Sequence, residues 1–407
     1  MKTLLSPVCL IATFFLWLCP SVFAESTDVL IVGNAQDGTV SFIDTETLTN
    51  IGTVDTYPDR TRMKFLIHAN PVRAIAYQVV KRKQLLHHFE PGGGDRFVDD
   101  VFLSPDGRTL YVSRSNLGDV AAFDLSKEDH PIIWRRFVAG FKADHAAISP
   151  DGKRLVVSAT SANKAQIFDA KTGKVIKSFK TGTYPHQNDY SHDGKYIYNS
   201  SIGDVGYKSV PYEKNKKKGR KLLVKVNADD GAIVDTWEFE YGIRPNIITP
   251  DDKTLYTQLS YLNGVVKYDL ENKKEISRNV QPLSDFALTT YKNKNEYPHD
   301  SAHHGLALSG DGKTLCDCGT IGNTVAMIDA ETMETKTMVD VGLVPYWAST
   351  GHKGKLCFVS MSGDDEVAVL DYEHGQVLAN IPVGHFPQRS RLGRIPQDVR
   401  EHLSHGR

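Results

Sequence analysis

The chain has 407 residues, of which 40% are hydrophobic and 24% are charged, and its formal net charge is −1. This composition is typical of a folded globular protein with a sizeable core. A nearly neutral chain has no overall field that attracts nucleic acid or a membrane surface, so we expect neither as a partner. We expect no membrane span and a monomer.

The first 24 residues have the pattern of a secretory signal peptide. Lys2 precedes an apolar stretch at residues 10–18, and Val22 and Ala24 occupy the −3 and −1 positions of a cleavage site. The sequence therefore predicts cleavage after Ala24 and a secreted or periplasmic protein. We expect residues 25–407 to form one domain.

Two short signals recur along the remaining chain with a period of about forty residues. One is an apolar run that ends in an acidic or amide residue at a turn: Asp44, Asp124, Asp169, Asn227, Asp269, Asp329 and Asp371. The other is a Ser-x-Asp-Gly tetrapeptide at residues 104–107, 149–152, 191–194 and 309–312, with weaker copies at 249–252 and 350–353. An alternating apolar strand pattern follows each tetrapeptide, so the Asp-Gly pairs predict hairpin turns.

The complete unit reads S-P-D-G-x-x-L-Y-V-S, then an apolar run that ends in I-D or F-D, then A-x-T-G-K-V. In this pattern the chain resembles the YVTN family of β-propellers over nearly its whole length after the signal peptide. The resemblance implies an all-β fold of seven four-stranded blades. Relatives include surface proteins, lactonase-like enzymes and domains like the haem d1 propeller of cytochrome cd1, so the resemblance implies no single activity.

The two signals differ in number, because six tetrapeptide-like starts accompany seven acidic turns. The copy without a tetrapeptide is the first one. Residues 29–44 contain its acidic turn but begin with the second strand of the blade, so the first strand is missing there. We expect residues 388–395, after Pro387, to supply the missing inner strand. Pairing of the N-terminal and C-terminal strands would then close the ring and leave no open sheet edge.

Three insertions interrupt the repeat, near residues 58–96, 202–221 and 281–300. In a propeller blade the tetrapeptide turns and the acidic turns share one face, and the other two classes of loop share the opposite face, here called the top face. All three insertions belong to the top-face classes. Because long loops on a rigid scaffold commonly carry binding function, the top face is the predicted functional face.

The residues at the top entry of each inner strand are mostly ionisable. They are Asp99, Asp144, His186, Arg244, His304 and Pro345, with neighbours Asp100, His145, Gln187, Asn246, His303, Tyr346 and Trp347. Each residue alone could simply bond to backbone or channel water. As a group they predict a polar pocket, because clustered charges and imidazoles are costly to bury without a ligand, an ion or water.

This pocket allows three kinds of chemistry. A transition metal such as Cu, Zn or Fe could be held by Asp144, His145, His186, His303 and His304. In a metal-free lyase or lactonase, His186 or His304 would be the general base, Arg244 would neutralise a substrate carboxylate and Tyr346 would donate a proton. A haem-like macrocycle with an axial histidine is the third option, implied by the likeness to haem d1 propellers.

We interpret the protein as a metal- or cofactor-assisted enzyme, such as an oxidoreductase, acting on a small or anionic substrate. Two alternatives stay open. One is the metal-free lyase or lactonase. The other is a non-catalytic binding or scaffold propeller whose top loops recognise a glycan or a protein.

Three cysteines follow the signal peptide: Cys316, Cys318 and Cys357. We interpret them as buried packing residues, since free cysteine is among the most buried residue types, and we make no prediction about a disulfide between them.

Overall fold

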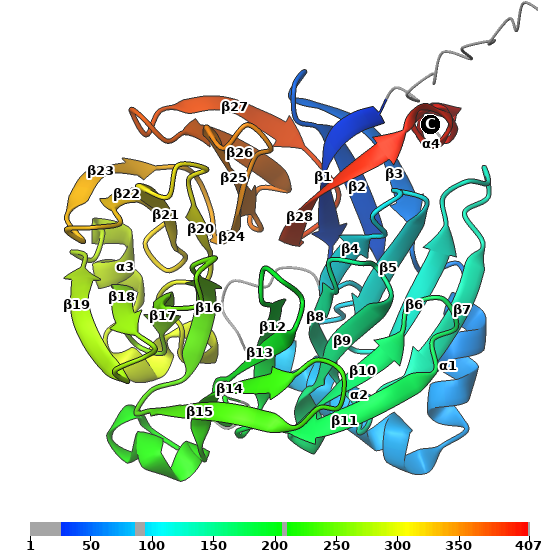
Figure 1. Cartoon of the computed structure of the whole chain (residues 1–407), viewed down its shortest axis with the longest axis horizontal. Helices are drawn as coiled ribbons and strands as arrows, with labels where there is room; N and C mark the ends of the chain where they lie inside the picture. Colours follow the sequence, from blue (N-terminus) through cyan, green and yellow to red (C-terminus); the bar gives the residue numbers. More distant parts are fainter. Residues whose placement is uncertain (1–25, 86–93, 206–209, 406–407) are drawn as a thin grey trace, which may run out of the picture.

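The computed structural model describes residues 26–85, 94–205 and 210–405. In this part of the chain, seven four-stranded antiparallel sheets are arranged in a ring, which confirms the predicted seven-bladed β-propeller (Figure 1). The predicted signal peptide lies outside the described residues.

The blades are numbered in chain order, and the strands of each are given from the central channel outward. Blade one consists of β28 (Pro387–Pro396), β1 (Ser26–Asn34), β2 (Thr39–Asp44) and β3 (Thr49–Asp55). Blade two consists of β4 (Asp100–Leu103), β5 (Thr109–Arg114), β6 (Asp119–Asp124) and β7 (Ile132–Phe137). Blade three consists of β8 (Ala143–Ile148), β9 (Arg154–Ala159), β10 (Lys164–Asp169) and β11 (Val175–Lys180). Blade four consists of β12 (Pro185–Tyr190), β13 (Tyr196–Ser201), β14 (Lys221–Asn227) and β15 (Ile233–Phe239).

The remaining three blades follow the same order. Blade five consists of β16 (Ile243–Ile248), β17 (Thr254–Leu259), β18 (Gly264–Asp269) and β19 (Lys274–Val280). Blade six consists of β20 (Leu306–Leu308), β21 (Thr314–Gly319), β22 (Thr324–Asp329) and β23 (Thr335–Asp340). Blade seven consists of β24 (Pro345–Thr350), β25 (Leu356–Met361), β26 (Glu366–Asp371) and β27 (Val377–Pro382).

Both recurring signals form turns. In the tetrapeptide at Ser104, the backbone N–H of Gly107 donates to the Ser104 carbonyl over 2.8 Å, and Gly107 has a φ of 70°. Glycine reaches this left-handed conformation without steric cost. At the acidic turn of blade one, Asp44 Oδ1 accepts hydrogen bonds from the backbone N–H groups of Glu46 and Thr47. The turn chemistry therefore lies where the sequence predicts it.

The ring closes as expected through the C-terminal strand. β28 is the innermost strand of blade one and pairs antiparallel with β1, with Leu30 opposite Leu392 and Val32 opposite Ser390. Figure 1 shows β28 beside β1, although the two strands lie at opposite ends of the chain. The helix α4 (Gln397–His405) follows β28 and packs on β3, where a Cβ at Gly52 would meet the Leu403 carbonyl oxygen at 2.5 Å.

An apolar cluster lies between each pair of neighbouring blades. In β1, Val29 and Ile31 pack towards blade two, whereas Leu30 and Val32 pack towards blade seven, and all four are fully buried. Because successive side chains of a strand point to opposite faces, one strand serves two interfaces. The core is therefore a ring of seven inter-blade layers around the channel, as far as the described residues show.

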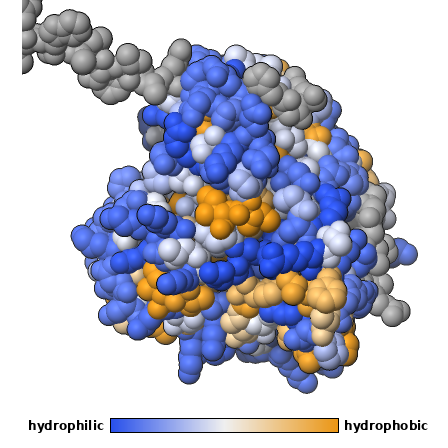
Figure 2. All heavy atoms as spheres, turned by 90° about the vertical axis from the view of Figure 1, so that its right-hand side faces the viewer, coloured by the Kyte–Doolittle hydropathy of each residue, from blue (hydrophilic) through white to orange (hydrophobic). Residues whose placement is uncertain are grey.

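The predicted insertions contain helices. The chain between β3 and β4 forms α1 (Arg60–His68) and α2 (Pro71–Leu85), and η2 (Tyr212–Lys218) lies between β13 and β14. Between β19 and β20 lie α3 (Asp285–Thr290), η3 (Lys294–Glu296) and η4 (Pro298–Asp300), and a single turn, η1 (Thr160–Ala162), follows β9. Figure 2 shows the side that carries β7 and α1–α2 as mainly hydrophilic, with separate apolar patches. None of the described helices combines the length and the apolarity that crossing a bilayer requires.

A disulfide, which the sequence analysis does not predict, links two blades. Cys316 in β21 and Cys357 in β25 are bonded across the interface of blades six and seven, and Cys318 is buried as a free thiol beside them. The bond is between neighbouring second strands, which are 41 residues apart in sequence. Only the stacking of the two blades brings these residues into bonding distance.

Removal of this disulfide should destabilise the ring. The variant Cys316→Ala plus Cys357→Ala is expected to lose about 2–4 kcal/mol of unfolding free energy, because the bond restricts the unfolded chain over a long loop. Urea unfolding would measure the loss. Cys318→Ala is the matched control, since it removes a buried sulfur without a bond. Equal destabilisation by the double variant and the control would contradict the structural role of the disulfide.

Candidate functional site

A buried pocket of about 40 Å³ lies at the top end of the central channel, where the inner strands begin. Its walls come from all seven blades, counting the residues just before β4 and β20, and from the three insertions. The described residues that line it are Arg96, Asp99, Lys142, Asp144, Tyr184, His186, Ile202, Val205, Arg244, His299, His304, Tyr346 and Arg389.

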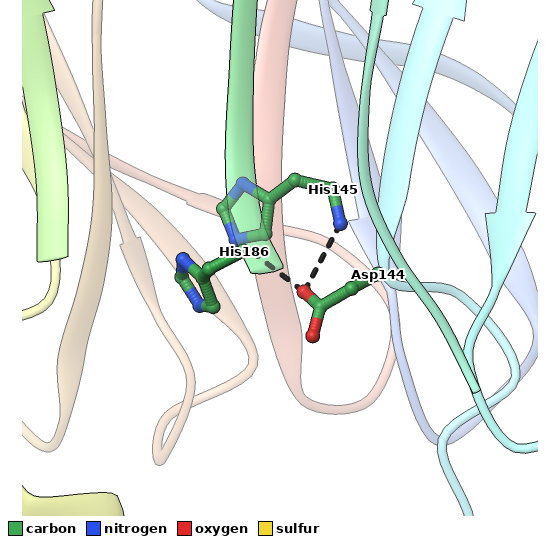
Figure 3. A group of neighbouring side chains, drawn as sticks. All are labelled: Asp144, His145 and His186. Carbon is green, nitrogen blue, oxygen red and sulfur yellow. Dashed lines mark hydrogen bonds and ion pairs between the residues drawn. The ribbon is translucent and has the colours of Figure 1, made fainter. Parts of the chain in front are cut away.

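Three imidazoles stand in a row at this end of the channel. The ring centroids of His145 and His186 are 4.1 Å apart, and those of His186 and His304 are 5.4 Å apart. Tyr346 stacks on His304 at 4.2 Å. Figure 3 shows the rings of His145 and His186 side by side, with the Asp144 carboxylate next to His145. Each histidine comes from the inner strand of a different blade or from the segment just before it.

The Arg389 side chain contacts the first two imidazoles of this row. One of its Nη atoms is 2.9 Å from Asp99 Oδ1, and the other contacts His145 Nε2 and lies 3.5 Å from His186 Nε2. Arg389 is 2% exposed and belongs to β28. A guanidinium can only donate hydrogen bonds, so His145 Nε2 accepts, and the ring hydrogen of His145 is on Nδ1.

His304 has the same tautomer for a different reason. Its Nδ1 is 3.3 Å from the backbone carbonyl oxygen of Tyr346. A carbonyl oxygen can only accept, so Nδ1 carries the hydrogen and Nε2 keeps its lone pair. His304 therefore presents a basic nitrogen within a pocket that it lines.

Burial and neighbouring cations keep these imidazoles neutral. Desolvation is the main cause that lowers the pKa of His145, His186 and His304 well below the usual range, and the Arg389 charge lowers it further. His299 has a pKa lowered well below the usual range by burial, with Arg96 as the next cause. Neutral imidazoles can accept a proton or bind a metal ion.

The carboxylates of Asp99 and Asp144 balance part of the positive charge of the neighbouring arginine and lysine side chains. Burial raises the pKa of Asp99 to about 6, against the opposing effect of Arg389. Burial also acts to raise the pKa of Asp144, but Lys142 and Arg389 hold it below its usual value. Lys142 Nζ lies 3.0 Å from Asp144 Oδ2. Asp144 is therefore the more firmly ionised of the pair.

The backbone of the third insertion forms a hydrogen bond with a residue of this site. The Arg244 guanidinium donates to the carbonyl oxygen of His299 and, through Nε, to Ser260 Oγ at 3.0 Å. His299 and Asp300 both have positive φ, 48° and 64°. Asp300 pairs with the buried Lys218 of the second insertion. These contacts join the two insertions beside the pocket.

The structure brings most of the predicted site residues together. Asp144, His186, Arg244, His304 and Tyr346 line one pocket, and His145 adjoins it. His303 lies apart.

The ring of His303 belongs to a separate buried network. Its Nδ1 is 2.8 Å from Asp317 Oδ2, and its Nε2 is 2.8 Å from Asn263 Oδ1. Neighbouring residues of an extended chain point to opposite sides, which is why His303 and His304 face different surroundings.

The repeat does not indicate Lys142 or Arg96 as site residues, and it indicates Arg389, together with His385, only as a weaker candidate on the top rim before the closing strand. Lys142 directly precedes β8, and Arg96 is at the end of the first insertion, so neither occupies the strand-entry position that the repeat highlights. Arg389 does occupy such a position, two residues after Pro387 in the ring-closing strand. That position was the available signal for Arg389.

One group of donors could hold a metal ion. The ligand atoms of Asp144, His145 and His186 all lie within 4.8 Å of one another. Ligands that share one Zn²⁺ at about 2.0–2.1 Å lie no more than about 4.2 Å apart, and the 3.8 Å between His145 Nε2 and Asp144 Oδ1 is within this limit. However, His145 Nε2 accepts from Arg389 in this arrangement, and the guanidinium would have to withdraw.

A macrocyclic cofactor does not fit the described pocket. Its volume of about 40 Å³ admits an ion, a few water molecules or one carboxylate group. We therefore derive no chemistry from a haem-like group.

Comparison with protein-family models and with curated proteins returned no match for this chain. The propeller fold thus stands on the structure, and the assignment to a particular propeller family stands on the sequence resemblance.

The buried histidines predict an acid-sensitive fold. Between their lowered pKa in the folded state and about 6.5, the unfolded chain binds more protons, so the unfolding free energy should decrease as the pH falls below about 6.5. The raised pKa values of the buried carboxyls Asp99 and Asp189 act in the opposite sense, as two groups against the four channel histidines. Each histidine adds up to about 1.4 kcal/mol per pH unit.

Urea unfolding at several pH values would measure this slope. His186→Asn should make the slope shallower, whereas His192→Asn, at an exposed turn, should leave it unchanged. An unchanged slope in His186→Asn would contradict the assignment of a depressed pKa to this residue.

Proposed function

We propose that this protein is an enzyme that binds the anionic group of a small organic substrate in the top pocket and moves a proton with a neutral imidazole. The observation that carries the proposal is the charge balance of the pocket. Its described lining has two carboxylates and four cationic side chains, which are Arg96, Lys142, Arg244 and Arg389. With the imidazoles neutral, the excess is positive and favours an anion.

A carboxylate is the anion that suits this pocket best. Guanidinium groups pair with planar carboxylates through two parallel hydrogen bonds. The volume of about 40 Å³ accommodates such a group but not a whole organic molecule, so the rest of the substrate would extend towards the top face. Arg389 and Arg244 would hold the carboxylate and stabilise charge that develops on it during the reaction.

His304 is the best-placed base. Its tautomer leaves a lone pair on Nε2, and its lowered pKa keeps it unprotonated at neutral pH. In a β-elimination the base would remove the proton next to the carboxylate, the C–H electron pair would form a double bond, and the leaving oxygen would take a proton from Tyr346. His186 is the second candidate for the base. The same groups suit lactone opening by an activated water molecule.

The sequence pattern supports this choice of reaction class and adds a location. We assign the chain to the YVTN-type propellers on its repeat, and lactonase-like enzymes are among the relatives that this resemblance implies. The pattern of residues 1–24 supports a secreted or periplasmic protein with a cleavable signal peptide.

Carboxylate binding should depend on Arg389. In a thermal-shift and calorimetric panel of small uronates, hydroxy acids and lactones, at least one carboxylate should bind, and Arg389→Met should weaken it about tenfold or more. Arg394→Met is the control, because Arg394 is on the same strand but is 56% exposed at the side chain and pairs with Asp28. If Arg389→Met is unstable, Arg389→Lys is the second variant. It tests whether a positive charge alone is sufficient for carboxylate binding.

Turnover separates an enzyme from a binding protein. With a carboxylate that binds, His304→Gln should retain affinity and lose about 10²–10⁴-fold in kcat. Binding without any turnover in the wild type would contradict the enzymatic proposal and favour the non-catalytic propeller. Failure of every carboxylate to bind would contradict the proposal as a whole.

A transition-metal site is the second candidate function, favoured by the close donors of Asp144, His145 and His186. Elemental analysis of the purified protein would test it. Under this candidate, stoichiometric Cu, Zn or Fe is present and is lost in His145→Ala plus His186→Ala. Under the leading proposal, no stoichiometric metal is found, and added Zn²⁺ does not raise the melting temperature. His352→Ala is a control at a partly exposed histidine outside the channel.

A further inference from the structure

A second cavity, here called the lower chamber, occupies the other end of the central channel. Its volume is about 290 Å³. It is lined by the ends of β12 and β16 and by the turns that follow them, at residues 191–194 and 249–252. The inner strand β12 has His186, its second residue, at the top pocket and ends with Asp189 and Tyr190 at the lower chamber, so the two cavities lie at opposite ends of the channel.

The charges of the lower chamber are already compensated. Arg391 donates to both oxygens of Asp100, over 3.0 and 2.8 Å. Asp189 accepts from Gln187 Nε2 at 2.6 Å, and burial raises its pKa to about 7. A strongly charged ligand would therefore find no unpaired counter-ion among these groups.

Three residues that line the chamber carry a buried polar atom without a hydrogen-bond partner: Trp347 (Nε1), Tyr190 (Oη) and Tyr198 (Oη). Trp347 is 3% exposed and packs against His145 and Arg391, which hold its ring in place. The other two tryptophans of the propeller differ. Trp134 Nε1 donates to the Ala170 carbonyl oxygen at 2.9 Å, and Trp237 Nε1 donates to that of Leu270 at 2.8 Å.

A buried indole N–H without a partner costs about 1–3 kcal/mol, and a ligand that accepts its hydrogen bond recovers that energy. The Tyr190 hydroxyl can donate or accept. A ligand with several hydroxyl groups offers both kinds of partner at short spacing. The chamber volume is at the lower end of the range for small-molecule sites.

We propose that the lower chamber binds a neutral polyhydroxylated molecule of about monosaccharide size, with Trp347 Nε1 as a central donor. This site is separate from the top pocket, and the proposal does not depend on the reaction assigned there.

Calorimetric titration of the purified protein with D-glucose, D-galactose and myo-inositol tests the proposal, at probe concentrations up to about 10 mM. At least one of these neutral probes should bind, and Trp347→Phe should weaken it about tenfold through loss of one hydrogen bond to a buried donor. Glucuronate and glucosamine are the charged counterparts of similar size and should bind more weakly than the neutral probes.

Trp237→Phe is the matched control. It removes an indole N–H that is already bonded, so it should lower the unfolding free energy and leave sugar binding unchanged. Trp347→Phe should weaken binding and should lower the unfolding free energy less than Trp237→Phe does, because it loses packing but no hydrogen bond.

Three results would overturn the proposal. The first is that none of the neutral probes binds. The second is that Trp347→Phe binds the best probe as tightly as the wild type. The third is that only the charged probes bind, which would assign the chamber to a different class of ligand.

Discussion

The antiparallel pairing of β28 with β1 is the interaction on which the rest of the structure depends. It closes the ring, so that every blade has two neighbours and no sheet edge is left open at the seam. It also places Arg389 and Arg391 in the channel, since residues two apart on a strand face the same side. Without this strand, Asp99 and Asp100 would be buried without their guanidinium partners, which is costly.

Oppositely charged side chains form ion pairs at successive levels along the channel. Lys142 pairs with Asp144 and Arg389 with Asp99 at the top, and Arg391 pairs with Asp100 below. The imidazoles between these pairs stay neutral because burial and the nearby cations oppose their protonation. The surplus of cations at the top and the paired charges below are the reason why we propose different classes of ligand for the two cavities.

The site could be predicted in outline because the repeat indicates where each inner strand begins. Aligned copies place Asp99, Asp144, His186, Arg244 and His304 at equivalent positions, and a ring of equivalent positions surrounds one axis. His303 shows the limit of this reasoning, since the neighbour of an entry residue points elsewhere and bonds to Asp317. Lys142 and Arg96 are outside the repeat position, so no periodic signal indicates their contribution to the charge of the pocket.

The sequence by itself determined the seven blades, the hairpin turns and the closure of the ring, because strand periodicity and turn chemistry are local properties that recur with each copy. Only the tertiary structure decided the pairing of Cys316 with Cys357, the contact of Arg389 with His145 and the unbonded indole of Trp347. These features depend on distances between side chains from different blades. Such distances follow from how the blades stack around the axis, which no single repeat encodes.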